Sequence, residues 1–153
     1  MKSKATKPQA KAERTYSNKM IIKNLEGGGK HIFLRCRLNG ADSMMLVDTG
    51  SSNTIFDSSS PCFADLKFKE IEQKESYSVN ASIEGVKYGK IDCLSIGDFS
   101  TPINKAFFMS LDQVNQLYEK TLGFRIIGII GSDFLKKHKA IIDFEGKKIS
   151  WRK

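Results

Sequence analysis

The stretch Leu-Val-Asp-Thr-Gly-Ser-Ser at residues 46–52 governs the interpretation of this 153-residue sequence. The apolar run at residues 44–47 predicts a buried strand, and the Thr-Gly-Ser that follows Asp48 predicts a tight turn. The Asp48 carboxylate is therefore expected where a core strand gives way to a loop, a position suited to chemistry. Aspartate also opens turns by accepting hydrogen bonds from backbone N–H groups, so this stretch alone favours a structural role.

A second stretch near the C-terminus, Ile-Ile-Gly-Ile-Ile-Gly-Ser-Asp-Phe-Leu at residues 126–135, repeats the order of apolar strand, glycine turn and small polar residues. It has no aspartate at the position that matches Asp48, because its strand ends in Ile130 and Gly131. Asp133 opens a predicted short helix at residues 132–138, where a negative charge interacts favourably with the helix dipole. Asp133 is therefore interpreted as a helix-end residue.

The two stretches, in this order, resemble the motifs of the retropepsin-like aspartic proteases, in particular the small single-domain bacterial type. The resemblance covers roughly residues 30–151. It implies a mostly β, single-domain fold with a closed β-barrel and one or two short helices. It also implies a catalytic turn in which Asp48 supplies the carboxylate, Thr49 cross-links two such turns, Gly50 lets the turn close and Ser51 donates a hydrogen bond to the carboxylate. No metal or organic cofactor is required.

The resemblance further implies a flap, a mobile hairpin that closes over bound peptide, within the strand-like residues 76–96. The residue pattern allows the chain to reverse either at residues 78–81 or at Glu84-Gly85, and the resemblance implies a substrate-binding tip at Val79, Asn80 and Ala81. Ser78 and Ala81 occupy positions where the family usually has glycine. This departure keeps open a second interpretation, in which the chain is a non-catalytic retropepsin-like module for dimerisation or peptide binding.

Hydrolysis of a peptide by carboxylates alone needs one group that takes a proton and another that gives one. Two aspartates about 3 Å apart cannot both ionise, so the pair divides into a base and an acid. The one suitable Asp-Thr-Gly, at residues 48–50, implies that a second copy of the chain supplies the other carboxylate across a twofold axis. The sequence thus predicts a homodimeric aspartic endopeptidase acting on peptide or protein substrates. With Ser51 donating to the carboxylate, we expect a bell-shaped rate profile with an acidic optimum.

Residues 1–19 differ in composition from the rest of the chain. They hold six basic residues against one acidic residue and so supply +5 of the formal net charge of +8. Because they have little apolar periodicity, we interpret them as a flexible basic arm, and residues 20–153 as the retropepsin-like domain. Lysine and alanine without interleaved aromatic residues do not favour base stacking, so nucleic acid is not an expected partner.

The sequence has no signal-peptide core and no run of about 18 apolar residues, so no membrane association is expected. Cys36, Cys62 and Cys93 are odd in number and far apart, which favours reduced thiols and a cytoplasmic location over a disulfide framework. Cys36 and Cys93 fall in strand-like runs and are predicted to be core residues.

Local patterns predict further elements. Asn39 and Gly40 form a two-residue hairpin turn, and His138, among lysines, is expected on the surface. Ser110 and Gln113 form a capping box before an amphipathic helix that Gly123 ends. The expected ranges are strands at 32–38, 43–47, 52–56 and 103–109, a helix at 111–122, and a hairpin at 140–151.

Overall fold

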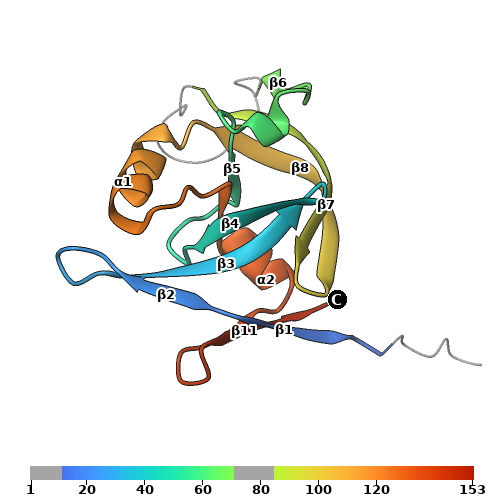
Figure 1. Ribbon diagram of the computed structural model, residues 1–153. Helices are drawn as coiled ribbons and strands as arrows, with labels where there is room; N and C mark the ends of the chain where they lie inside the picture. The colour runs from blue at the N-terminus through green and yellow to red at the C-terminus, as the bar shows by residue number, and fades with distance from the viewer. Residues whose placement is uncertain (1–11, 71–84) are drawn as a thin grey trace, which may run out of the picture.

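The computed structural model describes residues 12–70 and 85–153 (Figure 1). Its elements, in chain order, are β1 (Thr15–Lys19), β2 (Ile21–Asn24), β3 (Lys30–Leu38), β4 (Ala41–Val47), β5 (Ile55–Asp57), the 3-10 helix η1 (Pro61–Phe63), β6 (Lys69–Glu70), β7 (Lys87–Ile96), β8 (Phe99–Met109), α1 (Asp112–Leu122), β9 (Gly128–Ile130), α2 (Ser132–Lys137), β10 (Ile141–Asp143) and β11 (Lys148–Arg152). Within these residues, no helix has the length and apolar content needed to span a bilayer.

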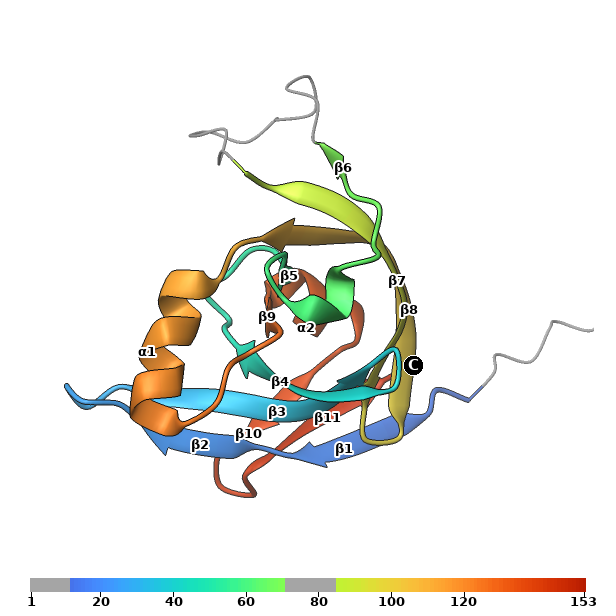
Figure 2. The same cartoon turned by 45° about the horizontal axis from the view of Figure 1, so that its top comes forward.

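Six strands in the described part of the chain close into a barrel. In the order β3-β4-β9-β5-β8-β7 each strand pairs with the next, and Arg37↔Ser95 and Leu38↔Leu94 join β7 back to β3. β2 and β6 extend the sheet beyond β3 and β7. Figure 2 shows this ring of strands with α1 on its outer side. The predicted fold, mostly β with a closed barrel and two short helices, is confirmed.

The β3–β4 hairpin brings Asp48 to the end of a core strand. Asn39 and Gly40 have φ values of 47° and 87°, which suit a two-residue type I′ turn, and the predicted turn is confirmed. From this turn the register runs from Leu38↔Ala41 to Ile32↔Val47. Asp48 is thus the first residue beyond the paired part of β4.

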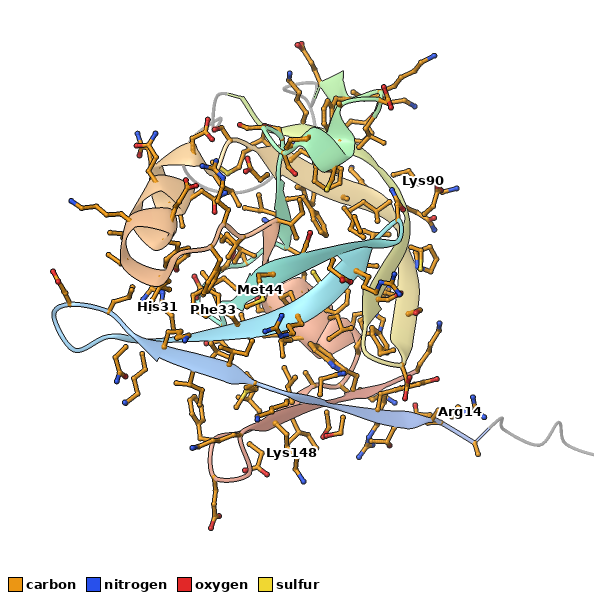
Figure 3. The ribbon with its side chains drawn as sticks, viewed as in Figure 1. Arg14, His31, Phe33, Met44, Lys90 and Lys148 are labelled. Carbon is orange, nitrogen blue, oxygen red and sulfur yellow. The ribbon has the colours of Figure 1, made fainter. Side chains whose placement is uncertain are left out.

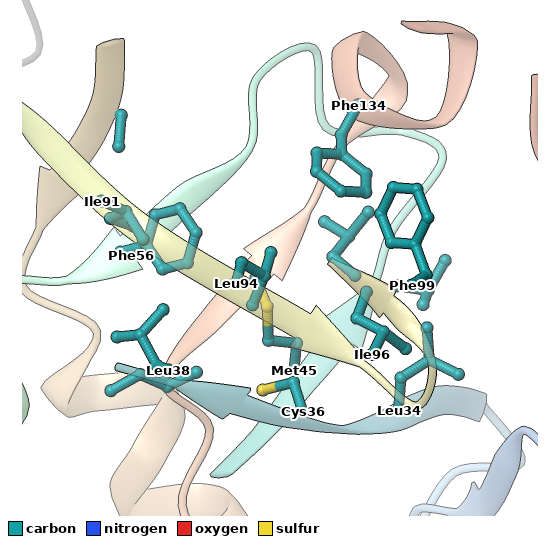
Figure 4. Close-up of a cluster of buried hydrophobic side chains, with 14 of the residues drawn as sticks. Leu34, Cys36, Leu38, Met45, Phe56, Ile91, Leu94, Ile96, Phe99 and Phe134 are labelled. Atoms are coloured by element: carbon teal, nitrogen blue, oxygen red, sulfur yellow. The ribbon is translucent and has the colours of Figure 1, made fainter. Parts of the chain in front are cut away.

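Two apolar clusters lie on opposite faces of the barrel wall. The larger one fills the interior, and Figure 4 shows part of it, including Leu34, Met45 and Phe134 of α2. The smaller one lies between the outer face of the sheet and α1, and its buried members are Phe33, Leu46, Leu111, Tyr118 and Ile126. Successive strand residues point to opposite faces, so Leu46 packs outward against α1 while Met45 packs inward.

Residues 15–19, which the sequence analysis assigns to a flexible arm, form β1 and pair with β11 over five residues. The arm interpretation is therefore wrong for these residues. Their side chains are mostly polar, but strand pairing uses backbone groups, and Trp151 Nε1 also donates to Asn18 Oδ1 at 2.9 Å. The sheet they join has the order β1-β11-β10.

His138 is buried, contrary to the expected surface position, with 7% of its surface exposed. It lies four residues after Phe134, on the same side of the α2 turn, and its ring packs 4.5 Å from that of Phe134 and 4.9 Å from that of Phe99. Burial, followed by the positive charge of Lys137, lowers the pKa of His138. The position of His138 four residues after Phe134 therefore decides its burial, although its neighbours in the sequence are lysines.

The two cysteines predicted to be core residues differ in their exposure to solvent. Cys36 is buried as predicted, and burial raises the pKa of its thiol to about 12. Cys93 is exposed, so that prediction is wrong. The register between β7 and β8 shifts between Ile91 and Leu94, which interrupts the alternation of buried and exposed positions at Cys93.

Candidate active site

The Asp48 turn is held by backbone hydrogen bonds on both sides of the aspartate. Asp48 N donates to Ile130 O of β9 at 3.0 Å, and Ser51 N donates to Asp48 O at 3.2 Å. Gly50 N donates to Asp48 Oδ1 at 2.9 Å, which orients the carboxylate. Asp48, Thr49 and Gly50 are exposed, so the carboxylate is fixed in position and accessible.

The second glycine turn packs directly beneath the first. β9 lies between β4 and β5, parallel to β4 with the pair Val47↔Ile130, and Ser132 N donates to Ser51 O at 2.8 Å. A Cβ atom at Gly131 would lie 2.5 Å from Asn53 O and 2.9 Å from Ser51 O. Only glycine therefore allows the two turns to approach this closely.

Ser51 does not donate to the Asp48 carboxylate in this structure. Its Oγ donates to the backbone oxygen of Asn53 at 2.8 Å, within its own turn. Among the described residues, Gly50 N is the group that donates to this carboxylate. The hydrogen bond that the resemblance implied for Ser51 is thus replaced by one that braces the turn, because the hydroxyl finds a carbonyl two residues further along the chain.

A family model described as "Aspartyl protease" matches residues 34–134, a range that includes both turns and more than half of the chain. The chain belongs to the aspartyl protease family. The retropepsin-like resemblance is therefore confirmed. No curated protein matches the sequence.

Two solved structures are similar to this chain. A retropepsin-like aspartic protease from Rickettsia conorii is 15% identical with a TM-score of 0.48, over 99% of this chain and 97% of that chain. The retroviral protease-like domain of Ddi1 from Leishmania major is 16% identical with a TM-score of 0.48, over 75% of this chain and 82% of that chain.

The structure describes one of the two groups of site residues predicted for this aspartyl protease family member. The proposed catalytic set of Asp48, Thr49, Gly50 and Ser51 lies together in one turn. The predicted flap tip, Val79, Asn80 and Ala81, lies outside the described residues.

Asp133 lies at the start of α2, as predicted, and supports the second turn. Its Oδ1 accepts from Thr54 Oγ1 at 2.7 Å and from Phe134 N at 2.7 Å. Thr54 Oγ1 in turn accepts from Gly131 N at 3.0 Å. Asp133 therefore braces the glycine turn under the site.

Asp57 and Asn115 are structural residues that the sequence analysis missed. Asp57 is 2% exposed, and its Oδ1 accepts from Leu111 N at 3.0 Å, at the start of α1. Ser110 Oγ accepts from Asp112 N at 3.3 Å and from Ser59 Oγ at 3.1 Å. The N-cap residue of α1 is Leu111, which makes no side-chain capping bond, so the predicted capping box of Ser110 and Gln113 does not form. The N-terminus of α1 is instead capped from β5, by a residue more than 50 positions away in the sequence.

A hydrogen-bonded pair beside Asp48, His31 and Tyr118, was also missed. His31 Nδ1 lies 2.6 Å from Tyr118 Oη, and Tyr118 is 2% exposed. Burial, and to a smaller extent the negative charge of Asp48, raises the pKa of Tyr118. Tyr118 falls within the amphipathic helix predicted at residues 111–122, and no local signal in the sequence pairs it with His31.

Proposed function

We propose that this chain is an aspartic endopeptidase that acts as a homodimer, with Asp48 of each copy forming the catalytic dyad. The observation that carries the proposal is the exposed Asp48 carboxylate, held by Gly50 N at 2.9 Å at the end of a barrel strand. Membership of the aspartyl protease family supports a peptidase. The single Asp-Thr-Gly supports a dyad made from two chains.

In the proposed reaction, the ionised Asp48 of one copy takes a proton from water as the water oxygen attacks the scissile carbonyl carbon. The protonated Asp48 of the other copy gives its proton to the carbonyl oxygen, forming a neutral tetrahedral diol. The C–N bond then breaks, a proton passes to the leaving nitrogen, and the products are a carboxylic acid and an amine. Water is consumed, and the dyad returns to its starting state with one shared proton.

The remaining proposals concern the role of Thr49, the substrate and the cellular location. Thr49 is exposed next to the carboxylate, where its hydroxyl can bond to the facing turn of a second copy. The substrate is a peptide or protein segment, with Val79, Asn80 and Ala81 as proposed contacts. The three free cysteines are compatible with a cytoplasmic location, which stays a proposal.

The test is a comparison of Asp48→Asn with Asp133→Asn in the full chain. Asp48→Asn is nearly isosteric and removes the shared proton, so hydrolysis of a peptide library should disappear while the melting temperature changes little. Asp133→Asn is the matched control, because an amide oxygen can still accept from Thr54 and Phe134 N. Activity that survives in Asp48→Asn contradicts the proposal. A wild-type chain that forms a dimer and binds peptides without cleaving them supports the non-catalytic module instead.

A further inference from the structure

Side chains from three neighbouring strands form an apolar row under α1. The pairs Ile21↔Phe33 and Phe33↔Leu46 run across β2, β3 and β4, and directly opposed residues point to the same face of a sheet. All three residues belong to the cluster that α1 covers. Figure 3 shows Phe33 on the part of β3 that lies near α1. This face of the sheet is thus the α1 face.

The next row on the same face is polar and ends at Asp48. Lys23 is paired with His31, two residues along each strand from Ile21 and Phe33. Asp48 lies two residues beyond Leu46, so it continues the row at the position next to His31 in register. Lys23 is exposed and His31 is partly exposed. A segment bound at Asp48 along this row would therefore pass His31 first and then Lys23.

Tyr118 of α1 holds His31 in place beside Asp48. Its hydroxyl lies 2.6 Å from His31 Nδ1, and its ring meets those of His31 and Phe33 edge to face, with centroids 5.7 and 5.2 Å apart. Burial keeps this phenol protonated, since it raises the pKa of Tyr118. We take the hydroxyl as the donor to Nδ1, which leaves the ring proton on Nε2, where it can be donated to a ligand.

We propose that His31 is a specificity-determining residue that selects substrates with an acidic side chain near the scissile bond. This inference rests on the proposed function of Asp48. Tyr118 sets the tautomer, His31 Nε2–H donates to the substrate carboxylate, and the Lys23 ammonium at the end of the row supplies a positive charge. A glutamine in the same place could accept the hydrogen bond but would lose the charge attraction.

The experiment uses the full chain and a statine-containing hexapeptide, whose hydroxyl mimics the tetrahedral diol. Glutamate and its glutamine counterpart are placed in turn at each position, and binding is measured by calorimetry. At one position the glutamate peptide should bind the wild-type chain about tenfold more tightly than the glutamine peptide does. This ratio corresponds to ~1.4 kcal/mol of binding free energy. Ratios near one at all positions overturn the inference, as does the absence of binding by both forms.

The variants separate recognition from a purely structural role. His31→Ala should bring the binding ratio close to one, and Tyr118→Phe, which keeps the ring, should reduce it. Lys23→Ala should reduce it partly, whereas Lys30→Ala is the matched control, because Lys30 lies on the opposite face and bonds to Asn24 at 2.9 Å. A ratio that stays at the wild-type value in His31→Ala and Tyr118→Phe contradicts the proposal even if both proteins melt at a lower temperature.

Nitrogen-15 spectra of the His31 ring give a readout that does not depend on catalysis. They should show the Nε2–H tautomer in wild type, a shift towards Nδ1–H in Tyr118→Phe, and a change at Nε2 with the glutamate peptide. A wild-type Nδ1–H tautomer overturns the inference. If wild type binds the glutamate form selectively but hydrolyses no peptide, the proposed catalytic function fails while the role of His31 stands.

Discussion

Asn115 and Asp57 form a buried amide–carboxylate pair, with Asn115 Nδ2 donating to Asp57 Oδ2 at 2.9 Å. Asn115 is 0% exposed and also bonds to both backbone groups of Ile126, which precedes β9. Since Asp57 ends β5 and Asn115 lies in α1, this pair ties the helix to the barrel wall. The same helix carries Tyr118, so the pair also supports the surroundings of Asp48.

Asn115→Ala should destabilise the fold strongly. The substitution leaves a buried carboxylate oxygen and two backbone groups without partners, at a cost of about 3 kcal/mol. At this chain length that lowers the melting temperature by roughly 10 °C. Gln116→Ala, at the next and exposed helix position, should change it by less than ~2 °C. Equal melting temperatures for the two variants would show that the pair contributes nothing to stability.

A dyad made from two chains makes activity depend on concentration. We expect the rate per chain to fall on dilution below the dimer dissociation constant, in parallel with the loss of dimer measured by light scattering. Added Asp48→Asn chain should inhibit at fixed wild-type concentration, because mixed dimers carry one carboxylate. A rate per chain that is constant on dilution to a demonstrated monomer would refute the dimeric site.

Ser51→Ala should leave the acidic limb of the rate profile in place. Its hydroxyl donates to Asn53 O rather than to Asp48, so the change removes a brace of the turn, worth ~1 kcal/mol, and no donor to the carboxylate. The measurement is the rate of peptide hydrolysis against pH for both proteins. An acidic limb displaced to higher pH would instead favour the donor role that the family resemblance implied.

Deletion of residues 1–19 should destabilise the chain, whereas deletion of residues 1–11 leaves β1 intact. β1 covers Trp151, the one tryptophan of the sequence, and Tyr16 packs on Phe99 with ring centroids 5.6 Å apart. The longer deletion should lower the melting temperature and shift tryptophan fluorescence to the red as Trp151 meets water. Identical spectra and melting temperatures for the two truncated chains would show that β1 adds nothing.

His138 should make stability depend on pH. Its folded-state pKa is lowered from 6.5 by burial, so the unfolded chain binds the proton more readily. Its stabilising contribution is therefore complete above pH 6.5 and is lost as the pH falls from 6.5 through the lowered folded-state pKa. His138→Gln should remove this part of the dependence in urea unfolding at a series of pH values. An unchanged slope below pH 6.5 in the variant would contradict this assignment.

The features that the sequence determined by itself are local ones. Asn39-Gly40 specifies its turn through backbone preference, and the spacing of apolar residues specifies α1. Two separate short motifs, at residues 48–50 and 128–131, indicate the candidate site and the family. Each signal lies within a few neighbouring residues, where backbone geometry and side-chain period act directly.

Tertiary structure alone decided the contacts between distant parts of the chain. Asp57 caps a helix 54 residues away, His31 bonds to Tyr118 across 87 residues, and Asn18 meets Trp151 across 133 residues. Local patterns cannot report such pairs, because each partner is ordinary in its own segment and acquires its role only when barrel closure brings the two together. The unexpected Ser51 bond has a different cause: the sequence offers the hydroxyl both a carboxylate and nearby backbone carbonyls as acceptors, and the folded turn selects Asn53 O.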